Sequence, residues 1–243
     1  RGMGKRTIIL HHHLFKNAGT SVDRILKDNF HEKWVTREFP TLRGGNTHLV
    51  EKWIREAPDA IAFSSHTLLG PLPRIDGVTL VSVLFLRDPI RRIRSAYRFE
   101  RQQESMNFGA VLAKQTDFSG YVRVRLATRG DRQCRNFQVH RLSSIVPGIA
   151  SELDGAIAAL SEVSIIGLVE DFVGSMVRLK AVLADSFPNF KIQNTRVNRS
   201  KSDECGDDEV DRVLFRILEE ANRDDRTLLD LARRRFLSSE QEV

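Results

Sequence analysis

The sequence predicts an α/β protein whose central parallel sheet is flanked by helices, and three observations support this. Short β-rich runs alternate with segments of helical periodicity, the order that crossover helices between parallel strands produce. Residues 78–86 form an almost continuous apolar run, typical of a strand buried on both faces. A glycine-containing turn at residues 14–21 connects the first strand to the first helix. We expect a single domain over residues 1–243, in which residues 1–6 are an N-terminal extension or an expression remnant.

The first elements follow from residue type and spacing. Residues 7–10 are expected to form a strand, and residues 60–64 a second one. Between them, apolar side chains recur at i, i+3, i+4 and i+8, which places them on one face of a helix. These side chains are Val22, Ile25, Leu26 and Phe30.

A helix start follows the central strand. Asp88 is a good N-cap, and Pro89 fits the first helical position, where its missing N–H costs nothing. We expect this helix to continue to about residue 103. Residues 108–143 are expected to be mostly helical and unusually basic.

The strand-helix alternation returns towards the C-terminus. Residues 164–169 are expected to form a strand, followed by a helix that Asp171 caps. Residues 194–206 are polar and rich in turn formers, so we expect a loop there. An amphipathic helix follows, with the apolar residues Val210, Val213, Leu214, Ile217 and Leu218.

Composition and charge narrow the class of protein. The net charge of +6 and the pI of about 9.6 favour anionic ligands without choosing among nucleotides, nucleic acids, membrane surfaces and acidic glycans. The apolar runs are far shorter than the ~20 residues that cross a bilayer, so we expect no membrane span. If Met3 is the native start, we expect a cytoplasmic protein; if an N-terminal anchor was removed, we expect a lumenal catalytic domain.

The most informative segment is the turn at residues 14–21, which reads Leu-Phe-Lys-Asn-Ala-Gly-Thr-Ser. A glycine-containing turn that enters a helix directs backbone N–H groups and the positive end of the helix dipole at one point, which suits a phosphate. Because Lys16 precedes Gly19, the segment does not have the Gly-Lys-Ser/Thr order of nucleoside triphosphatases. The candidate phosphate-binding residues are Lys16, Asn17, Ala18, Gly19, Thr20 and Ser21.

A second phosphate motif is expected at residues 86–97, which read Leu-Arg-Asp-Pro-Ile-Arg-Arg-Ile-Arg-Ser-Ala-Tyr. Arg87, at the carboxyl end of a strand, can place its guanidinium fork on a phosphate, and Ser95 can donate from the following helix. Two different phosphate motifs, each at a strand-to-helix corner, seldom arise together by chance.

Together these segments resemble the sulfotransferases that use 3′-phosphoadenosine-5′-phosphosulfate (PAPS), in particular the carbohydrate branch with the heparan sulfate 2-O-, uronyl and bacterial-type enzymes. His13, Lys16 and residues 18–21 fit the 5′-phosphosulfate pattern His-x-Pro-Lys-Thr-Gly/Ala-Gly-Thr-Ser. Phe15 replaces the Pro of that pattern, and Asn17 replaces its usual Thr. The second segment resembles the 3′-phosphate motif, Arg-Asp-Pro followed by Ser-x-Tyr. The resemblance implies a sulfotransferase fold similar to that of the P-loop triphosphatases.

The resemblance extends more loosely to the acceptor side. Residues 63–66 stand where related glycan sulfotransferases have a Gly-His pair, which implies that His66 is the catalytic base. Residues 136–138 resemble an Asn-x-Gln segment, which implies that the acceptor is bound by Arg132, Asn136 and Gln138.

Two further segments match the family mainly by position. Residues 167–172 resemble its later Gly-Leu-x-Glu-x-Phe segment. The basic residues Arg199 and Lys201 correspond in role to a loop that closes over the nucleotide.

The resemblance implies in-line transfer of a sulfuryl group from PAPS to a hydroxyl of a carbohydrate acceptor, anionic glycans included. Such a transfer needs an oriented nucleophile and a stabilised leaving phosphate. Lys16 is expected to donate to the bridging oxygen, and His66 to accept the hydroxyl proton. The scheme requires no metal and leaves adenosine 3′,5′-bisphosphate as product. The acceptor's identity and the oligomeric state stay open.

Each motif also has a purely structural interpretation. The turn at residues 14–21 can serve only to cap a helix, and Arg87 with Ser95 can be a helix-start ion pair and a surface hydroxyl. His66 can be a packed or capping histidine at the end of a strand.

A histidine cluster at the end of the first strand suggests a metal site as an alternative. His11, His12 and His13 are consecutive. We expect no metal there, because no carboxylate or cysteine stands at ligand spacing and alternate strand residues point to opposite faces.

The arginines between residues 121 and 141 are either a solvated helical face or a groove for an anionic acceptor. Only Asp131 opposes them within the segment. The arginines are Arg123, Arg125, Arg129, Arg132, Arg135 and Arg141.

Two other functional classes compete with a sulfotransferase. A nucleotide-dependent kinase or triphosphatase can use the same strand-loop-helix arrangement, but the phosphate loop lacks the required residue order. A nucleic-acid binder would fit the basic charge. We expect no nucleic acid as partner, because Tyr121 and Phe137 are the only aromatic residues among the arginines.

Overall fold

The computed structural model describes residues 6–193 and 211–240. The chain forms two compact units, each built from two separate stretches of sequence. Unit 1 comprises Arg1–Leu86 and Arg141–Asn198, and unit 2 comprises Arg87–His140 and Arg199–Val243. Each unit has a hydrophobic core of its own. A single domain over residues 1–243 stays a prediction.

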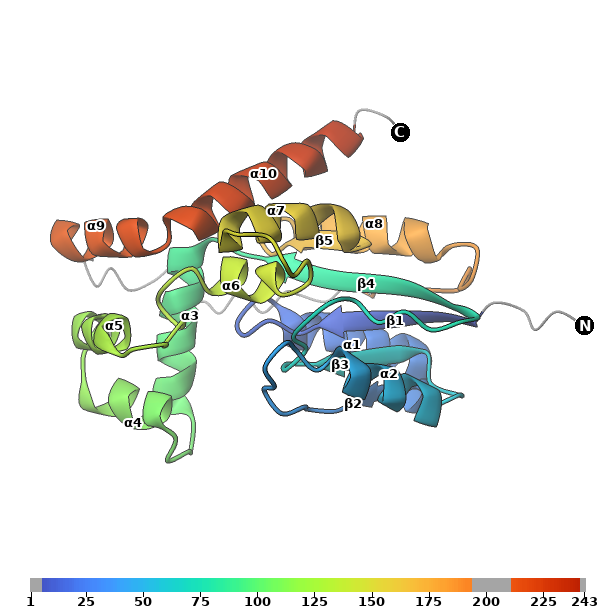
Figure 1. Cartoon of the computed structure of the whole chain (residues 1–243), viewed down its shortest axis with the longest axis horizontal. Coiled ribbons are helices and arrows are strands. Elements are labelled where there is room, and N and C mark those ends of the chain that lie inside the picture. The colour runs from blue at the N-terminus through green and yellow to red at the C-terminus, as the bar shows by residue number, and fades with distance from the viewer. Residues whose placement is uncertain (1–5, 194–210, 241–243) are drawn as a thin grey trace, which may run out of the picture. The chain divides into compact units, whose positions relative to one another are not determined.

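Unit 1 contains a five-stranded sheet in the order β2-β3-β1-β4-β5, with every neighbouring pair parallel (Figure 1). The expected α/β class with a central parallel sheet flanked by helices is therefore confirmed. The strand β4 has the bounds that the sequence predicts. Its residues 81–86 are all buried, in agreement with the expected position at the centre of the sheet. The strands are β1 (Arg6–His12), β2 (Trp34–Thr36), β3 (Ala62–Ser65), β4 (Val78–Leu86) and β5 (Ile165–Leu168).

Helices of unit 1 cover both faces of this sheet. On β1, Ile9 belongs to the same core cluster as α1 and α8, whereas Ile8 and Leu10 pack with α2. Ile9 lies on one face of the sheet and Ile8 and Leu10 on the other, because successive side chains of a strand point to opposite faces. The helices are α1 (Gly19–Phe30), the 3₁₀ helix η1 (His31–Lys33), α2 (Thr47–Glu56), α7 (Glu152–Glu162) and α8 (Phe172–Leu183).

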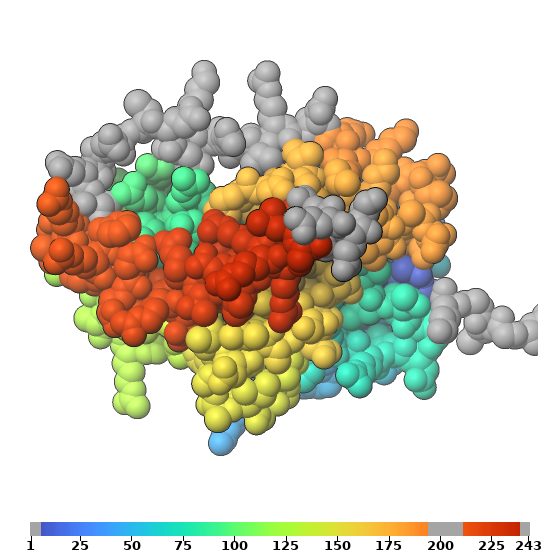
Figure 2. All heavy atoms as spheres, turned by 90° about the horizontal axis from the view of Figure 1, so that it is seen from above, coloured from blue at the N-terminus to red at the C-terminus, as the bar shows by residue number. Residues whose placement is uncertain are grey.

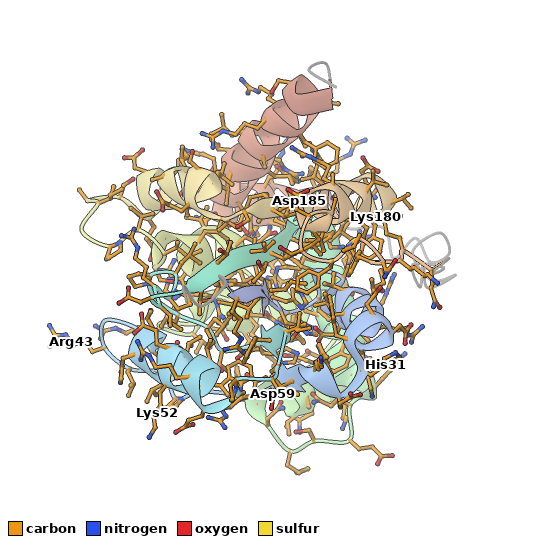
Figure 3. The ribbon with its side chains drawn as sticks, turned by 90° about the vertical axis from the view of Figure 1, so that its right-hand side faces the viewer. His31, Arg43, Lys52, Asp59, Lys180 and Asp185 are labelled. Carbon is orange, nitrogen blue, oxygen red and sulfur yellow. The ribbon has the colours of Figure 1, made fainter. Side chains whose placement is uncertain are left out.

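The figures show the two helical layers of unit 1 from different sides. In Figure 3, α2 with Lys52 lies on one side of the sheet, and α1 and α8, near His31 and Lys180, lie on the other. In Figure 2, α7 (yellow) lies at the lower edge of the view and α8 (orange) at its upper right. The sheet is therefore covered on both faces, as its apolar strands require.

The regular elements among the described residues of unit 2 are all helices. Its core contains Ile93 of α3, Tyr121 of α5, and Leu214 and Leu218 of α9. The helices are α3 (Pro89–Gln102), α4 (Phe108–Gln115), α5 (Phe118–Ala127), α9 (Arg212–Ala221) and α10 (Arg223–Glu240). Helix α6 (Phe137–Ser143) crosses the sequence boundary between the units.

Most expected helix boundaries are confirmed. Asp88 accepts from the backbone N–H of Ile90 and Arg91, both at 3.0 Å, and Asp171 accepts from Gly174 at 3.1 Å. The second expected strand begins at residue 62 rather than 60. The expected loop at residues 194–206 lies outside the described residues. None of the helices in the described ranges has the length and apolar character needed to cross a membrane.

Candidate functional site

The turn between β1 and α1 has an uncommon backbone shape. Lys16 and Ala18 have positive φ values of 65° and 59°, a left-handed conformation that costs roughly 1–2 kcal/mol for a residue with a Cβ atom. Between them, the buried Asn17 donates from Nδ2 to the carbonyl oxygen of Phe85 on β4 at 2.8 Å. This hydrogen bond anchors the turn to the neighbouring strand, so Asn17, one of the two residues that depart from the sulfotransferase pattern, has a clear structural role.

The helix α1 begins without a capping side chain. Its N-cap is Ala18, and its first turn contains no acidic residue. By contrast, Asp88 and Asp171 cap α3 and α8. The N–H groups at a helix start carry partial positive charge, and left-handed residues in a turn help to direct N–H groups into a common concavity. The start of α1 is therefore suited to an external anion.

His13 packs against the first residue of α1. A Cβ atom at Gly19 would lie 2.2 Å from Nε2 of His13 and 2.0 Å from its Cδ2, closer than real atoms approach. Only glycine leaves room for the imidazole edge here. Nδ1 of His13 lies 2.8 Å from Oδ2 of Asp23 on α1, so Nε2 is the ring nitrogen beside the phosphate turn.

His66 directly follows β3 and forms a pair with Glu38. Its side chain is 51% exposed, and its Nδ1 lies 2.7 Å from Oε1 of Glu38. Glu38 also accepts from the backbone N–H of His66 at 3.1 Å and from the hydroxyl of Thr67 at 2.8 Å. Partial burial raises the pKa of Glu38, but the hydrogen bonds from His66 and Thr67 outweigh it and the net pKa is lowered. An ionised Glu38 therefore orients His66 so that Nε2 can exchange a proton.

Two backbone interactions position His66. Arg141 donates from Nη2 to the carbonyl oxygens of His66 at 2.8 Å and Leu68 at 2.9 Å. The backbone N–H of His13 donates to the carbonyl of Ser65 at 3.0 Å. These bonds hold the imidazoles of His13 and His66 together, with ring centroids 3.8 Å apart.

Asp23 connects His11 of β1 with His13, which directly follows the strand. Its Oδ1 lies 2.7 Å from Nδ1 of the buried His11, while Oδ2 contacts His13. Burial lowers the pKa of His11, which is therefore neutral near pH 7. Burial raises the pKa of Asp23, but the hydrogen bonds from both histidines outweigh it and hold the pKa well below its usual range.

This arrangement corrects one expectation about metals. A carboxylate does stand at ligand spacing, because atoms of His11, His13 and Asp23 lie within 4.8 Å of one another. The sequence did not reveal it, because Asp23 is on a helix whose register against β1 only the structure defines. Asp23 already bonds to both histidines through its two oxygens, so we interpret the group as hydrogen-bonded side chains.

The expected residues that belong to unit 2 are Arg87, Ser95, Arg132, Asn136 and Gln138. Arg87 follows β4 directly in sequence. Its N–H donates to Oε1 of the buried Gln138, and its carbonyl accepts from Nε2 of Gln138, both at 2.8 Å. Gln138 thus holds the backbone of Arg87, and its contact with the acceptor stays a prediction. Ser95 is partly buried on α3.

Asn136 and Arg132 precede α6. Asn136 has a φ of 42°, and its Oδ1 accepts from the backbone N–H of Asp225 at 3.2 Å. Arg132 is partly buried. Arg199 and Lys201 lie outside the described residues, so their expected role also stays a prediction.

The basic segment is not a uniform charged face. Arg125 is nearly buried and pairs with Asp131 at 2.8 Å and with Glu100 of α3 at 2.9 Å. Besides Asp131, the acidic residue within the segment, Glu100 from α3 therefore also opposes the arginines. Arg123, Arg129 and Arg135 are exposed, whereas Arg141 belongs to unit 1.

Sequence reasoning missed Glu38, Asp23 and the role of Arg141. Asp23 follows Gly19 by about one helical turn, a spacing that could have directed attention to it. Glu38 lies in an irregular segment after β2, and no spacing relates it to His66.

Comparison with known proteins identifies a relative of this chain. No family model matches it. An uncharacterized protein from Archaeoglobus fulgidus is 38% identical over 241 residues, an alignment that covers 92% of this chain and 94% of that protein. The chain therefore belongs to the same family as this uncharacterized Archaeoglobus fulgidus protein.

Proposed function

We propose that the protein is a PAPS-dependent sulfotransferase that transfers a sulfuryl group to a hydroxyl of a carbohydrate. The observation that carries the proposal is the double contact of His13, which packs against Gly19 of the phosphate turn and against the ring of His66. The imidazole of His66, held by the carboxylate of Glu38, is thereby close to the start of α1, which is suited to bind an anion. This combination suits sulfuryl transfer, because the transferred group is anionic and the acceptor hydroxyl must lose a proton.

In the proposed reaction, the acceptor oxygen attacks sulfur in line with the bond to the leaving phosphate. Nε2 of His66 accepts the hydroxyl proton, and Glu38 stabilises the imidazolium that forms. The start of α1 and Lys16 stabilise the charge that develops on the leaving phosphate. Both carboxylate oxygens of Asp23 form hydrogen bonds with histidines, His11 and His13, so the scheme assigns no step to a metal.

Sequence resemblance supports the remaining parts of the proposal. Arg87 and Ser95 would bind the 3′-phosphate, and the fold would be of the sulfotransferase type related to the P-loop triphosphatases. Gln138 supports this role for Arg87, since it fixes the backbone from which the guanidinium extends. The carbohydrate acceptor and its binding by Arg132 and Asn136 rest on the resemblance alone.

Calorimetric titration with adenosine 3′,5′-bisphosphate tests the donor. We expect micromolar binding that adenosine 5′-monophosphate does not reproduce. Arg87→Ala should weaken this binding, whereas Arg91→Ala, an exposed arginine one helical turn later, is the matched control. Lys16→Ala should lower kcat more than nucleotide affinity.

Three results would argue against the proposal. Equal affinity losses for Lys16→Ala and Arg87→Ala would contradict their separate roles. Binding of magnesium-ATP in preference to the bisphosphate would favour a kinase or triphosphatase. No binding of either nucleotide would overturn both phosphate motifs.

A further inference from the structure

Two histidine–carboxylate pairs lie side by side in unit 1. In the first, Nδ1 of His13 is 2.8 Å from Asp23; in the second, Nδ1 of His66 is 2.7 Å from Glu38. The two rings are in contact, with centroids 3.8 Å apart and planes 35° apart. In both pairs the carboxylate holds Nδ1, so both histidines have Nε2 available for chemistry.

This contact disfavours simultaneous protonation of the two rings, because two imidazolium cations in contact repel each other. The carboxylate on each Nδ1 stabilises a single cation, so the pair suits a state with one cation and one neutral ring. The charged or titratable groups around them are Asp23 from α1, Glu38 after β2, the neutral His11 from β1, and Arg141 from α6, which donates to the carbonyl oxygen of His66. The arrangement therefore favours an acid next to a base.

The surroundings of the two rings distinguish their roles. His13 is only 11% exposed, and its Nε2 edge packs at Gly19, where the phosphate turn enters α1. His66 is 51% exposed and follows β3. An anion held at the turn stabilises a cation at His13, which leaves His66 as the neutral ring.

We propose that His13 is a second catalytic residue, whose Nε2–H donates to the phosphate oxygen that leaves sulfur. This inference rests on the proposed sulfotransferase function. The bond between the acceptor oxygen and sulfur forms while the bond between sulfur and the phosphate oxygen breaks. The electron pair of the broken bond stays on the phosphate oxygen, which takes the Nε2 proton of His13, so the two rings together still carry one positive charge when His66 becomes protonated. The hydroxyl proton passes to Nε2 of His66.

The test compares His13→Gln with wild type in nucleotide affinity, kcat and the pH profile of kcat. Positioned acid–base groups contribute about 10²–10⁴-fold, so we expect kcat to fall about 100-fold or more while affinity for adenosine 3′,5′-bisphosphate changes little. The pH profile of kcat should also change in shape in the variant, because a proton donor is removed from the chemical step. His12→Gln is the matched control, because His12 is the adjacent residue on the opposite face of β1, and it should keep both kcat and the profile.

The outcomes separate this inference from the proposed function. If wild type transfers sulfate and His13→Gln retains its kcat, His13 is not catalytic, although the sulfotransferase function stands. If His13→Gln loses nucleotide affinity as strongly as kcat, His13 only shapes the turn and the inference is overturned. If wild type neither binds the bisphosphate nor transfers sulfate, the proposed function fails and this inference fails with it.

A second measurement uses wild type alone, so it does not depend on whether the variants fold. Nitrogen NMR of the imidazoles, in the complex with adenosine 3′,5′-bisphosphate at the pH of maximal kcat, should show one doubly protonated and one neutral ring for the contacting histidines. Two neutral rings would overturn the inference.

Discussion

Glu38 bonds to the imidazole and the backbone N–H of His66 and to the hydroxyl of Thr67. One side chain thus fixes both the shape of the turn after β3 and the orientation of His66. The lowered pKa of Glu38 keeps it ionised, so its charge can stabilise a protonated imidazole. These contacts make Glu38 a positioning residue for the proposed base.

Replacement of this carboxylate by its amide gives a direct test. Glu38→Gln keeps the size of the side chain but removes the charge that stabilises the imidazolium, so we expect kcat to fall at least about 10-fold, a part of what a positioned base contributes. Affinity for adenosine 3′,5′-bisphosphate should stay the same. Glu56→Gln is the control, since its side chain is 49% exposed against 48% for Glu38. Equal kcat values for the two variants would show that Glu38 does not act through His66.

At the scale of elements, N-caps explain where several helices begin. Asp88, Asn107, Asp117, Ser151, Asp171 and Asp211 each accept from the first turn of their helix. The helices α1 and α2 have no such cap. The uncapped start of α1 coincides with the proposed phosphate site, where a capping carboxylate would repel an anion.

The cap of α8 can be measured. Asp171→Ala removes the acceptor for the Gly174 N–H, and we expect the free energy of unfolding to fall by about 1 kcal/mol. Urea denaturation monitors the change. Asp185→Ala, just beyond the other end of α8, is the control and should be neutral or slightly stabilising, because an acid is unfavourable near a helix C-terminus. A loss of similar size in both variants would contradict the capping argument.

The sequence predicts some elements better than others for physical reasons. β4 is clear because it is buried on both faces, and α3 and α8 are clear because strong caps mark their starts. β2 was missed because it has three residues, and α2 because Asn46 makes no side-chain cap. The pairing of His66 with Glu38 was not predictable, since it depends on an irregular segment far from His66 in sequence.

At the scale of the whole molecule, buried titratable groups make stability depend on pH. Burial, aided by the positive charge of Arg141, lowers the pKa of His12 to about 3. The unfolded chain binds this proton near pH 6.5. The pKa values of His11 and Asp23 are also lowered in the fold. In all three cases the unfolded state gains protons first as the pH falls.

We therefore expect the free energy of unfolding to decline as the pH drops from about 6.5 towards 3. His12 and His11 act over the upper part of this range, and Asp23 adds its loss below about pH 4. Urea denaturation at several pH values gives the curve. In His12→Gln the decline should be shallower, whereas His48→Gln, an exposed histidine on α2, should retain the wild-type slope. A pH-independent stability over this range would be contrary to the burial of these groups.

The division of the chain into units made of separate stretches has a consequence for synthesis on the ribosome. β4 needs β5 as its neighbour, yet residues 87–140, which belong to unit 2, emerge between these strands. Until residues 165–168 have been made, residues 83–86 of β4, which pair with β5 in the fold, have an unpaired edge in the nascent chain. Unit 2 likewise waits for α9, which supplies Leu214 and Leu218 to its core. The growing polypeptide is therefore most prone to aggregation before its last third is translated. At that stage the unpaired edge of β4 and the incomplete core of unit 2 are exposed, and chaperones are expected to bind there.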